Sequence, residues 1–262
     1  MNLLFLGDIV GKPGRLAVRA LLPKLIHREQ AGFVIANCEN ISGGAGVEPA
    51  NCRELLEAGV DVLTSGNHIW RKREIVDYIE QETRLLRPSN FPPGTPGSGW
   101  RCFRTPDGTE VAVVNLMGRV FMDAMDCPFQ AADGILAALA GRTRVIFVDM
   151  HAEATSEKGA MGWHLAGRVS AVVGSHTHVQ TSDERVLEPG TAFLTDAGMC
   201  GPIDSVIGVK HELAIRRFVT HLPTKFETAS GRTVVQGAVV SVDPASGRAS
   251  AIKRIQEYVD RP

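Results

Sequence analysis

Short apolar segments of strand length recur along the chain, and the first of them alternate with segments of helical periodicity. Between the first and second apolar segments, apolar positions in 15–28 recur at the spacing of an amphipathic helix, and 49–58 predicts a second helix. The order strand, helix, strand, helix, strand is typical of right-handed crossovers in a parallel sheet. The predicted strands are 3–6, 33–36, 60–64, 111–115, 145–149, 171–173 and 191–194. The pattern therefore predicts an α/β fold.

The remaining segments indicate how the strands are connected. Proline and glycine are dense in 86–100, which predicts a surface loop. Residues 236–255 predict a hairpin that turns at 243–247. Because no linker, repeat or low-complexity tract divides the sequence, we predict a single domain over 1–262. Two sheets packed face to face with helices outside would accommodate this many strands.

Composition and charge exclude several classes of protein. The 262 residues are 44% apolar and 22% charged, with a formal net charge of −1, which is too apolar and too balanced for a disordered chain. Apolar runs fall short of the roughly 18 residues that cross a bilayer, and the near-zero charge gives no general attraction to DNA or anionic membranes. The start of the chain, 1–8, lacks the features of a signal peptide. Five cysteines without a C-x-x-C pair then favour reduced thiols in a cytoplasm.

Polar side chains with metal-binding chemistry follow five of the predicted strands. In parallel sheets, the carboxyl ends of the strands line the crevice where ligands bind, so these residues are expected on one rim. They are Asp8, then Glu39 with Asn40, then Asn67 with His68, then His151, and last His176 with His178.

Each of these residues has an ordinary structural explanation when it is taken alone. Asp8 would serve as a helix cap or turn former, Asn67 would hold a left-handed turn beside Gly66, and a lone histidine is more often a hydrogen-bonded structural residue. The convergence of five strand ends favours a metal site instead. Four histidines outside the pattern are interpreted as structural: His27, His164, His211 and His221.

The donor types narrow the kind of metal centre. Carboxylate, amide and imidazole groups without a cysteine ligand disfavour structural zinc and suit iron, manganese or catalytic zinc. The donors are too numerous for one ion. They match two ions about 3.5–4 Å apart that share a bridging carboxylate.

The order of these blocks resembles the calcineurin-like metallophosphoesterase superfamily, and Gly66-Asn67-His68 matches its Gly-Asn-His motif. Two blocks depart from that superfamily, since Val10 stands where an early histidine is usual and Glu39 where aspartate is usual. Both departures resemble one subgroup, the YmdB-like metallophosphoesterases, described as 2′,3′-cyclic nucleotide phosphodiesterases. The blocks that carry this resemblance are 7–11 (GDIVG), 37–40 (NCEN), 64–68 (TSGNH) and 195–202 (TDAGMCGP).

The resemblance implies a four-layer α/β/β/α sandwich, a homo-oligomer and two metal ions, usually iron, although the ligand set also accepts manganese. Position by position, it implies that Glu39 bridges the two ions. Asn40 would take the coordination position that the usual histidine fills in the superfamily and that Val10 cannot fill. The first ion would be held by Asp8, Glu39, Asn40 and His178, and the second by Glu39, Asn67, His151 and His176.

The resemblance also implies a mechanism, in which a metal-bridging hydroxide attacks phosphorus and His68 protonates the departing ribose oxygen. We expect nearby carboxylates to raise the pKa of His68 and so to help it hold that proton. The alternative is that His68 only orients Asn67.

Contacts to the substrate are less defined by the sequence. The glycine-rich turn 42–46 contains Ser42, Gly43 and Gly44, whose amides are candidates for a phosphate contact; a tight surface turn is the alternative. Three cations within 70–74 favour a solvated helix start over a phosphate contact. The segments 195–202 and 204–208 resemble the family but receive no chemical role, beyond shaping a pocket or an oligomer contact.

Three functions stay open at this point. The first is a dinuclear phosphodiesterase for 2′,3′-cyclic nucleotides or for the cyclic ends left by RNA cleavage. The second is a general phosphomonoesterase, which needs the same two metals. The third is a regulatory or scaffolding protein in RNA metabolism whose metal site is mainly structural.

Overall fold

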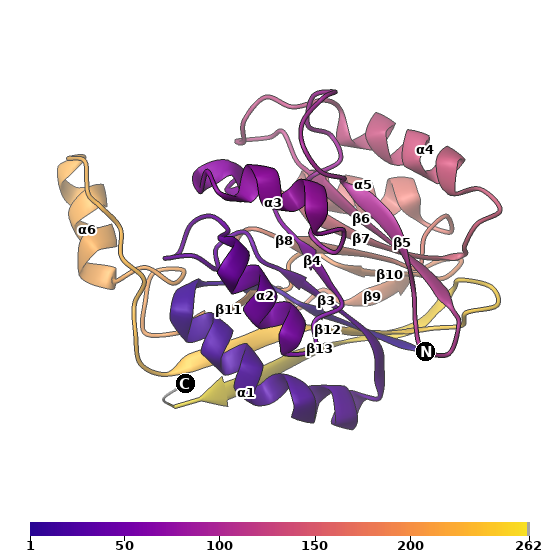
Figure 1. Ribbon diagram of the computed structural model, residues 1–262, viewed down its shortest axis with the longest axis horizontal. Helices are drawn as coiled ribbons and strands as arrows, with labels where there is room; N and C mark the ends of the chain where they lie inside the picture. The colour runs from indigo at the N-terminus through magenta and orange to yellow at the C-terminus, as the bar shows by residue number, and fades with distance from the viewer. Residues whose placement is uncertain (261–262) are drawn as a thin grey trace.

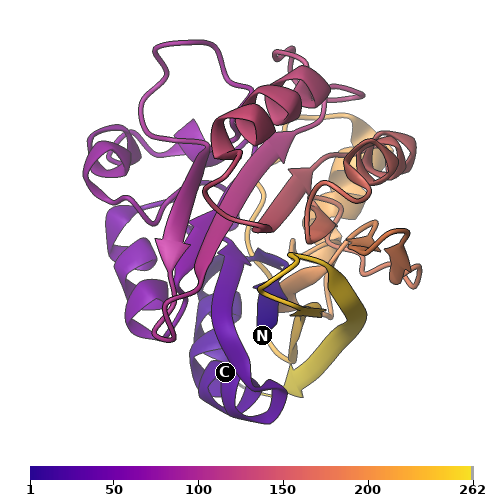
Figure 2. The same ribbon diagram turned by 90° about the vertical axis from the view of Figure 1, so that its right-hand side faces the viewer.

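The computed structural model describes residues 1–260, and its centre is a pair of β-sheets packed face to face (Figures 1 and 2). The first sheet has the strand order β2-β11-β12-β1-β3-β4, and β13 pairs with β12. Its strands are β1 (Asn2–Leu6), β2 (Asp8–Ile9), β3 (Ala31–Asn37), β4 (Val62–Thr64), β11 (Met199–Pro202), β12 (Thr233–Val242) and β13 (Ala249–Val259).

The second sheet has the strand order β5-β6-β7-β8-β10-β9. Its inner strands β6, β7, β8 and β10 run parallel, and its outer strands β5 and β9 are antiparallel to their neighbours. In the first sheet, β1, β3 and β4 run parallel, as do β2 and β11, while β12 is antiparallel to β1, β11 and β13. Both sheets are therefore mixed. The strands of the second sheet are β5 (Trp100–Arg104), β6 (Glu110–Met117), β7 (Val145–His151), β8 (Ala171–Ser175), β9 (Arg185–Leu187) and β10 (Thr191–Leu194).

Three apolar layers explain why the sheets stack. Alternate residues of β1 point to opposite faces: Leu3 and Phe5 pack between the sheets, where Phe5 lies 5.1 Å from Phe147 of β7. Leu4 and Leu6 face outward against the helices. The outer face of the second sheet is covered in the same way by a separate cluster. The four-layer α/β/β/α prediction is confirmed.

Helices on the two outer faces complete the layers. On the first sheet lie α1 (Gly11–Glu29) and α2 (Pro49–Glu57), followed by the short η1 (Ile69–Arg71) and α3 (Ile75–Gln81). On the second sheet lie α4 (Pro128–Leu139) and α5 (Thr155–Leu165). The last helix, α6 (His211–Thr220), stands away from both sheets (Figure 1). No helix in the described part of the chain is long and apolar enough to span a membrane.

The predicted elements are present, with differences at the boundaries. All seven predicted strands occur, and the predicted hairpin is formed by β12 and β13. Helix α1 begins at Gly11, four residues before the predicted start. The prediction that 86–100 lies at the surface is wrong in part, because Leu86 and Asn90 are buried. The side chain of Asn90 is held inside by hydrogen bonds with Met117 at 2.8 and 2.9 Å.

Candidate metal centre

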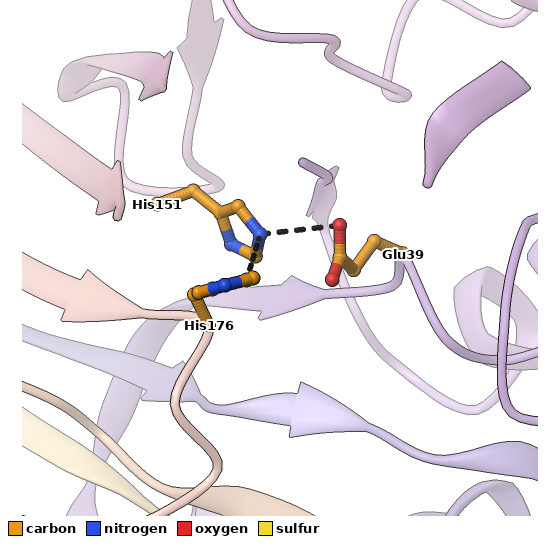
Figure 3. Close-up of side chains that lie close together, drawn as sticks. All are labelled: Glu39, His151 and His176. Carbon is orange, nitrogen blue, oxygen red and sulfur yellow. Dashed lines mark hydrogen bonds and ion pairs between the residues drawn. The ribbon is translucent and has the colours of Figure 1, made fainter. Parts of the chain in front are cut away.

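Three strand ends deliver one compact group of ligand atoms, drawn in Figure 3. Glu39 follows β3, His151 ends β7, and His176 follows β8; one ligand atom from each lies within 4.8 Å of the others. His151 Nε2 is 3.1 Å from Glu39 Oε2 and 3.1 Å from His176 Nδ1. The carboxyl ends of parallel strands therefore meet as the sequence predicts.

The other four predicted ligands lie around this group. Asn67 Oδ1 is 3.2 Å from His151 Nε2. Asp8 Oδ1 is 3.8 Å from His178 Nε2, and Asp8 Oδ2 accepts the backbone N–H of His176 at 2.9 Å. Asn40 completes the set through contacts with Glu39 and His178. All seven predicted ligands are thus in one place, and their roles toward an ion stay predictions.

Asn40 is present at the centre but is turned differently from a ligand. Its amide nitrogen is 3.1 Å from Glu39 Oε1 and 3.1 Å from His178 Nε2, while its oxygen is 2.8 Å from His68 Nδ1. Since an amide binds metals through its oxygen, coordination by Asn40 requires this amide to turn over.

Contacts behind each histidine fix which ring nitrogen faces the centre. His151 Nδ1 is 2.9 Å from Ser175 Oγ, which in turn donates to Asp149 at 2.6 Å. His178 Nδ1 donates to the carbonyl of Ile207 at 2.8 Å. Both rings therefore aim Nε2 inward, an arrangement that commonly supports metal-binding histidines.

Glu153 contacts a predicted ligand but was not predicted as a site residue. Its Oε2 is 3.2 Å from His176 Nε2, so it orients the ring whose Nδ1 faces His151. The available signal was its position two residues after His151, where a carboxylate at a strand end shares the same rim.

Removing the hydroxyl behind His151 is expected to weaken metal binding without removing a ligand. We expect Ser175→Ala to lower metal affinity by about 10–100-fold, since such supporting contacts have effects of that size. Metal titration of the metal-free protein measures this. Ser170→Ala is the matched control, because the buried Ser170 hydroxyl bonds Gly247 in another region, at 2.6 Å. Equal affinities for the two variants would contradict the role given to Ser175.

The side chains present fit a cation. Asp8 and Glu39 are 0% and 1% exposed, and Asp8 Oδ1 has no hydrogen-bond partner among the described residues. A buried carboxylate oxygen without a partner is costly, and a metal ion removes that cost. The donor atoms are oxygen and nitrogen only, which suits divalent ions of the first transition row.

Burial and the neighbouring charges shift the pKa values of the same residues. Burial raises the pKa of Asp8 to about 6, although His178 and His151 oppose the shift. Burial favours a neutral His151, but Glu39 and Asp8 outweigh it and raise its pKa to about 9. Burial would also raise the pKa of Glu39, yet His151 and His68 hold it well below its usual range.

His68 lies at the edge of the centre, with its side chain 26% exposed. Its backbone N–H donates to Glu39 Oε2 at 3.1 Å, and its Nδ1 lies 2.8 Å from Asn40 Oδ1. The expectation of a raised pKa is wrong: burial lowers the pKa of His68, and the opposing effect of Glu39 is smaller. Its ring contacts Asn40 and Glu39, which does not favour the alternative role of orienting Asn67.

A cavity of about 730 Å³ opens beside these side chains. Gly43 and Gly44, the candidates for a phosphate contact, line it. Arg71 and Lys72 line it too, and Arg71 is exposed, in agreement with the predicted solvated position. Ser42 does not line it: its hydroxyl accepts the backbone N–H of Glu48 at 2.9 Å and Asn51 Nδ2 at 2.7 Å. Ser42 therefore holds the loop before α2. Its backbone N–H donates to Gly46 at 3.0 Å, so the predicted phosphate contact by this amide is not supported.

A buried ion pair stabilises the turn that carries His176 and His178. Both histidines have positive φ angles, 102° and 65°, which are strained for residues other than glycine. Between them, the backbone N–H of Thr177 donates to Asp196 Oδ2 at 3.1 Å, and Lys158 Nζ donates to the same oxygen at 2.6 Å. This gives 195–202, which received no chemical role from the sequence, a structural role.

Comparison with known proteins identifies the family. The model of the family described as YmdB-like protein matches residues 4–255. The chain belongs to the YmdB-like family. Among its relatives, it is 48% identical to a Bacillus subtilis protein named 2′,3′-cyclic-nucleotide 2′-phosphodiesterase, over 97% of this chain and 96% of that protein.

Two solved structures of other proteins agree with the fold. A crystal structure described as a novel phosphatase from Mycoplasma pneumoniae is 32% identical, with a TM-score of 0.93, over 100% of this chain and 95% of that one. The calcineurin-like phosphoesterase YfkN from Bacillus subtilis matches at a TM-score of 0.52 and 10% identity, over 98% and 90% of the two chains. That second likeness extends to the fold alone.

Proposed function

We propose that the protein is a metal-dependent phosphodiesterase that hydrolyses 2′,3′-cyclic nucleotides at a centre of two divalent ions. The observation that carries the proposal is the meeting of seven ligand-type side chains from five strand ends, with His68 beside them on the wall of one cavity. The name of the Bacillus subtilis relative supports the same substrate and favours cleavage of the 2′ bond.

The residues divide the chemistry between them. The predicted ligands would hold the two ions, which when bound supply a nucleophile at neutral pH and neutralise phosphate charge. His68 Nδ1 faces the Asn40 amide at 2.8 Å, so Nε2 is the nitrogen left free to hold a proton for the departing ribose oxygen. Burial lowers the pKa of His68, and an anionic phosphodiester in the cavity opposes that shift because negative charge favours the imidazolium.

The test of this proposal compares His68→Ala with Asp8→Ala. We expect His68→Ala to keep the metal content of the wild type and to lose about 10²–10⁴-fold in kcat on 2′,3′-cAMP, the usual contribution of a general acid. Asp8→Ala removes a predicted ligand and is expected to lose metal as well. Elemental analysis and product chromatography measure both effects.

Two results would overturn the proposal. A wild-type protein that binds no iron or manganese after reconstitution would exclude the metal centre. Wild-type protein that binds two ions but leaves 2′,3′-cAMP intact would exclude the substrate.

The second candidate is a phosphomonoesterase, which the description of the Mycoplasma pneumoniae relative as a phosphatase favours. Turnover of 2′,3′-cAMP compared with 3′-AMP separates the two activities. A regulatory role in RNA metabolism predicts instead that His68→Ala leaves the cellular phenotype unchanged.

Finer features remain part of the proposal. We expect iron as the native metal, with manganese able to replace it. The cysteines of the described residues are all free thiols, in line with a cytoplasmic location. We likewise expect a homo-oligomer and a single domain over 1–262. The expected partner is a cyclic nucleotide or an RNA end, and neither DNA nor a membrane.

A further inference from the structure

We propose that one wall of the cavity, formed by Ile207, Val209 and Phe226, is the subsite for the nucleobase and accepts all four bases. We call these three residues the apolar wall. The inference rests on the proposed function, because it names the part of the substrate that lies away from the metal centre. It goes further by assigning base tolerance and the residues responsible for it.

The apolar wall is built from two segments on either side of α6. Val209 pairs with Thr228 in an antiparallel bridge. The backbone N–H of Lys210 donates to the carbonyl of Glu227 at 3.0 Å, and that of Ala229 donates to Gly208 at 2.9 Å. These bonds hold the two segments together as one ordered surface.

The same segments are attached directly to the metal centre. The carbonyl of Ile207 accepts the Nδ1 hydrogen bond of His178 at 2.8 Å. Gly208, at a φ of 97°, packs so closely on Val10 that an added Cβ would lie 2.7 Å from Val10 Cγ1. Val10 follows Asp8 by two residues. The apolar wall is therefore fixed in position relative to two predicted ligands.

The chemistry of the cavity matches a molecule with one anionic end and one flat apolar end. The cavity is lined both by polar groups, including four of the predicted ligands with Arg71 and Lys72, and by the apolar wall. Ile207 and Phe226 are each 49% exposed, and in the part of the chain that the structure describes no aromatic ring stacks on Phe226. A nucleoside 2′,3′-cyclic phosphate carries its charge on O2′ and O3′ and its flat base on C1′, on the other face of the ribose.

The polar groups beside the apolar wall are unsuited to reading base edges. Glu227 is paired with Lys210 at 2.7 Å. Thr228 Oγ1 is buried and has no hydrogen-bond partner among the described residues, but a hydroxyl both donates and accepts, so it does not select one base. Stacking on an apolar or aromatic surface depends little on base identity, because every base has a π face. This is why we infer base tolerance.

The test uses a substrate with a base and one without, 2′,3′-cAMP and ribose 2′,3′-cyclic phosphate. Phe226→Ala is expected to raise KM for 2′,3′-cAMP by roughly 10–100-fold, the size of one lost stacking contact, with kcat and metal content nearly unchanged. KM for the base-free substrate is expected to stay the same, and Phe226→Trp is expected to restore the KM for 2′,3′-cAMP. Phe218→Ala, on the 74% exposed Phe218 of α6 outside the cavity, is the matched control.

The outcomes separate this inference from the proposed function. An equal change in KM for both substrates in Phe226→Ala, or no change for either, would overturn the base subsite. A kcat/KM of the wild type more than about 100-fold higher for one of the four 2′,3′-cyclic nucleotides than for the others would overturn base tolerance. Failure of the proposed function gives a different result, in which the wild type hydrolyses neither substrate. Equilibrium binding of 3′-AMP then decides: weaker binding to Phe226→Ala supports the subsite, and equal binding overturns it.

Discussion

Lys158→Met is expected to destabilise the protein by about 3–5 kcal/mol, the cost of breaking a buried ion pair on one side. Lys158 and Asp196 are each only 1% exposed, and their charged atoms are 2.6 Å apart. Removing the ammonium group leaves the carboxylate buried without its counter-charge. Thermal unfolding of the metal-free protein measures the loss, which corresponds to a fall in Tm on the order of 10 °C for a chain of this size.

The same substitution is expected to weaken metal binding, because Asp196 also holds the backbone of Thr177 between His176 and His178. The double variant Lys158→Met with Asp196→Asn removes both charges and is expected to regain part of the stability but not the metal affinity. Lys24→Met, on an exposed lysine of α1, is the control and is expected to change stability by less than about 0.5 kcal/mol. A change below about 1 kcal/mol in Lys158→Met would contradict the prediction.

The central strands and the ligands could be predicted because each is indicated by a short, continuous stretch of the sequence. Strands such as β3 and β7 are continuous apolar runs, as strands buried on both faces are, and the ligand-type residues follow within a few positions. The geometry of a parallel sheet then brings those residues together without any long-range information.

The outer elements were missed because their sequences lack such a signal. Strand β9 exposes two of its three residues, and β11 contains glycine and proline, which read as a loop. Helix α5 contains Gly162, which lowers its helical signal, although that glycine is required where the helix packs on Phe193. The secondary structure of these segments is therefore determined by tertiary packing.

The features of the site that could not be predicted depend on contacts between residues that are distant in the sequence. The pKa of His68 depends on burial, which no spacing reveals. The partnership of Lys158 with Asp196 joins residues 38 positions apart, and that of His178 with Ile207 joins residues 29 apart. Such pairs follow from the completed fold rather than from any local motif.

Gly66→Ala is expected to abolish hydrolysis although it removes no ligand. A Cβ on Gly66 would lie 2.2 Å from His151 Nε2 and 2.4 Å from Glu39 Oε2, in the middle of the candidate metal centre. The backbone has little freedom to retreat, because the neighbouring Ser65 N–H donates to Asn115 Oδ1 at 3.0 Å and its hydroxyl donates to Leu86 at 2.8 Å. We therefore expect displaced ligands, loss of bound metal and turnover at background level.

The effect of Gly66→Ala is expected to come from steric overlap of the added Cβ and not from backbone strain, since φ at Gly66 is not in the left-handed region. The matched control is Gly134→Ala on α4, where an added Cβ has no neighbour within 4 Å and alanine favours the helix by about 1 kcal/mol. Metal content and hydrolysis of 2′,3′-cAMP measure the difference between the two variants. If Gly66→Ala keeps both metal and turnover, the ligands cannot be in the arrangement from which the proposed chemistry is argued, and the centre must lie elsewhere.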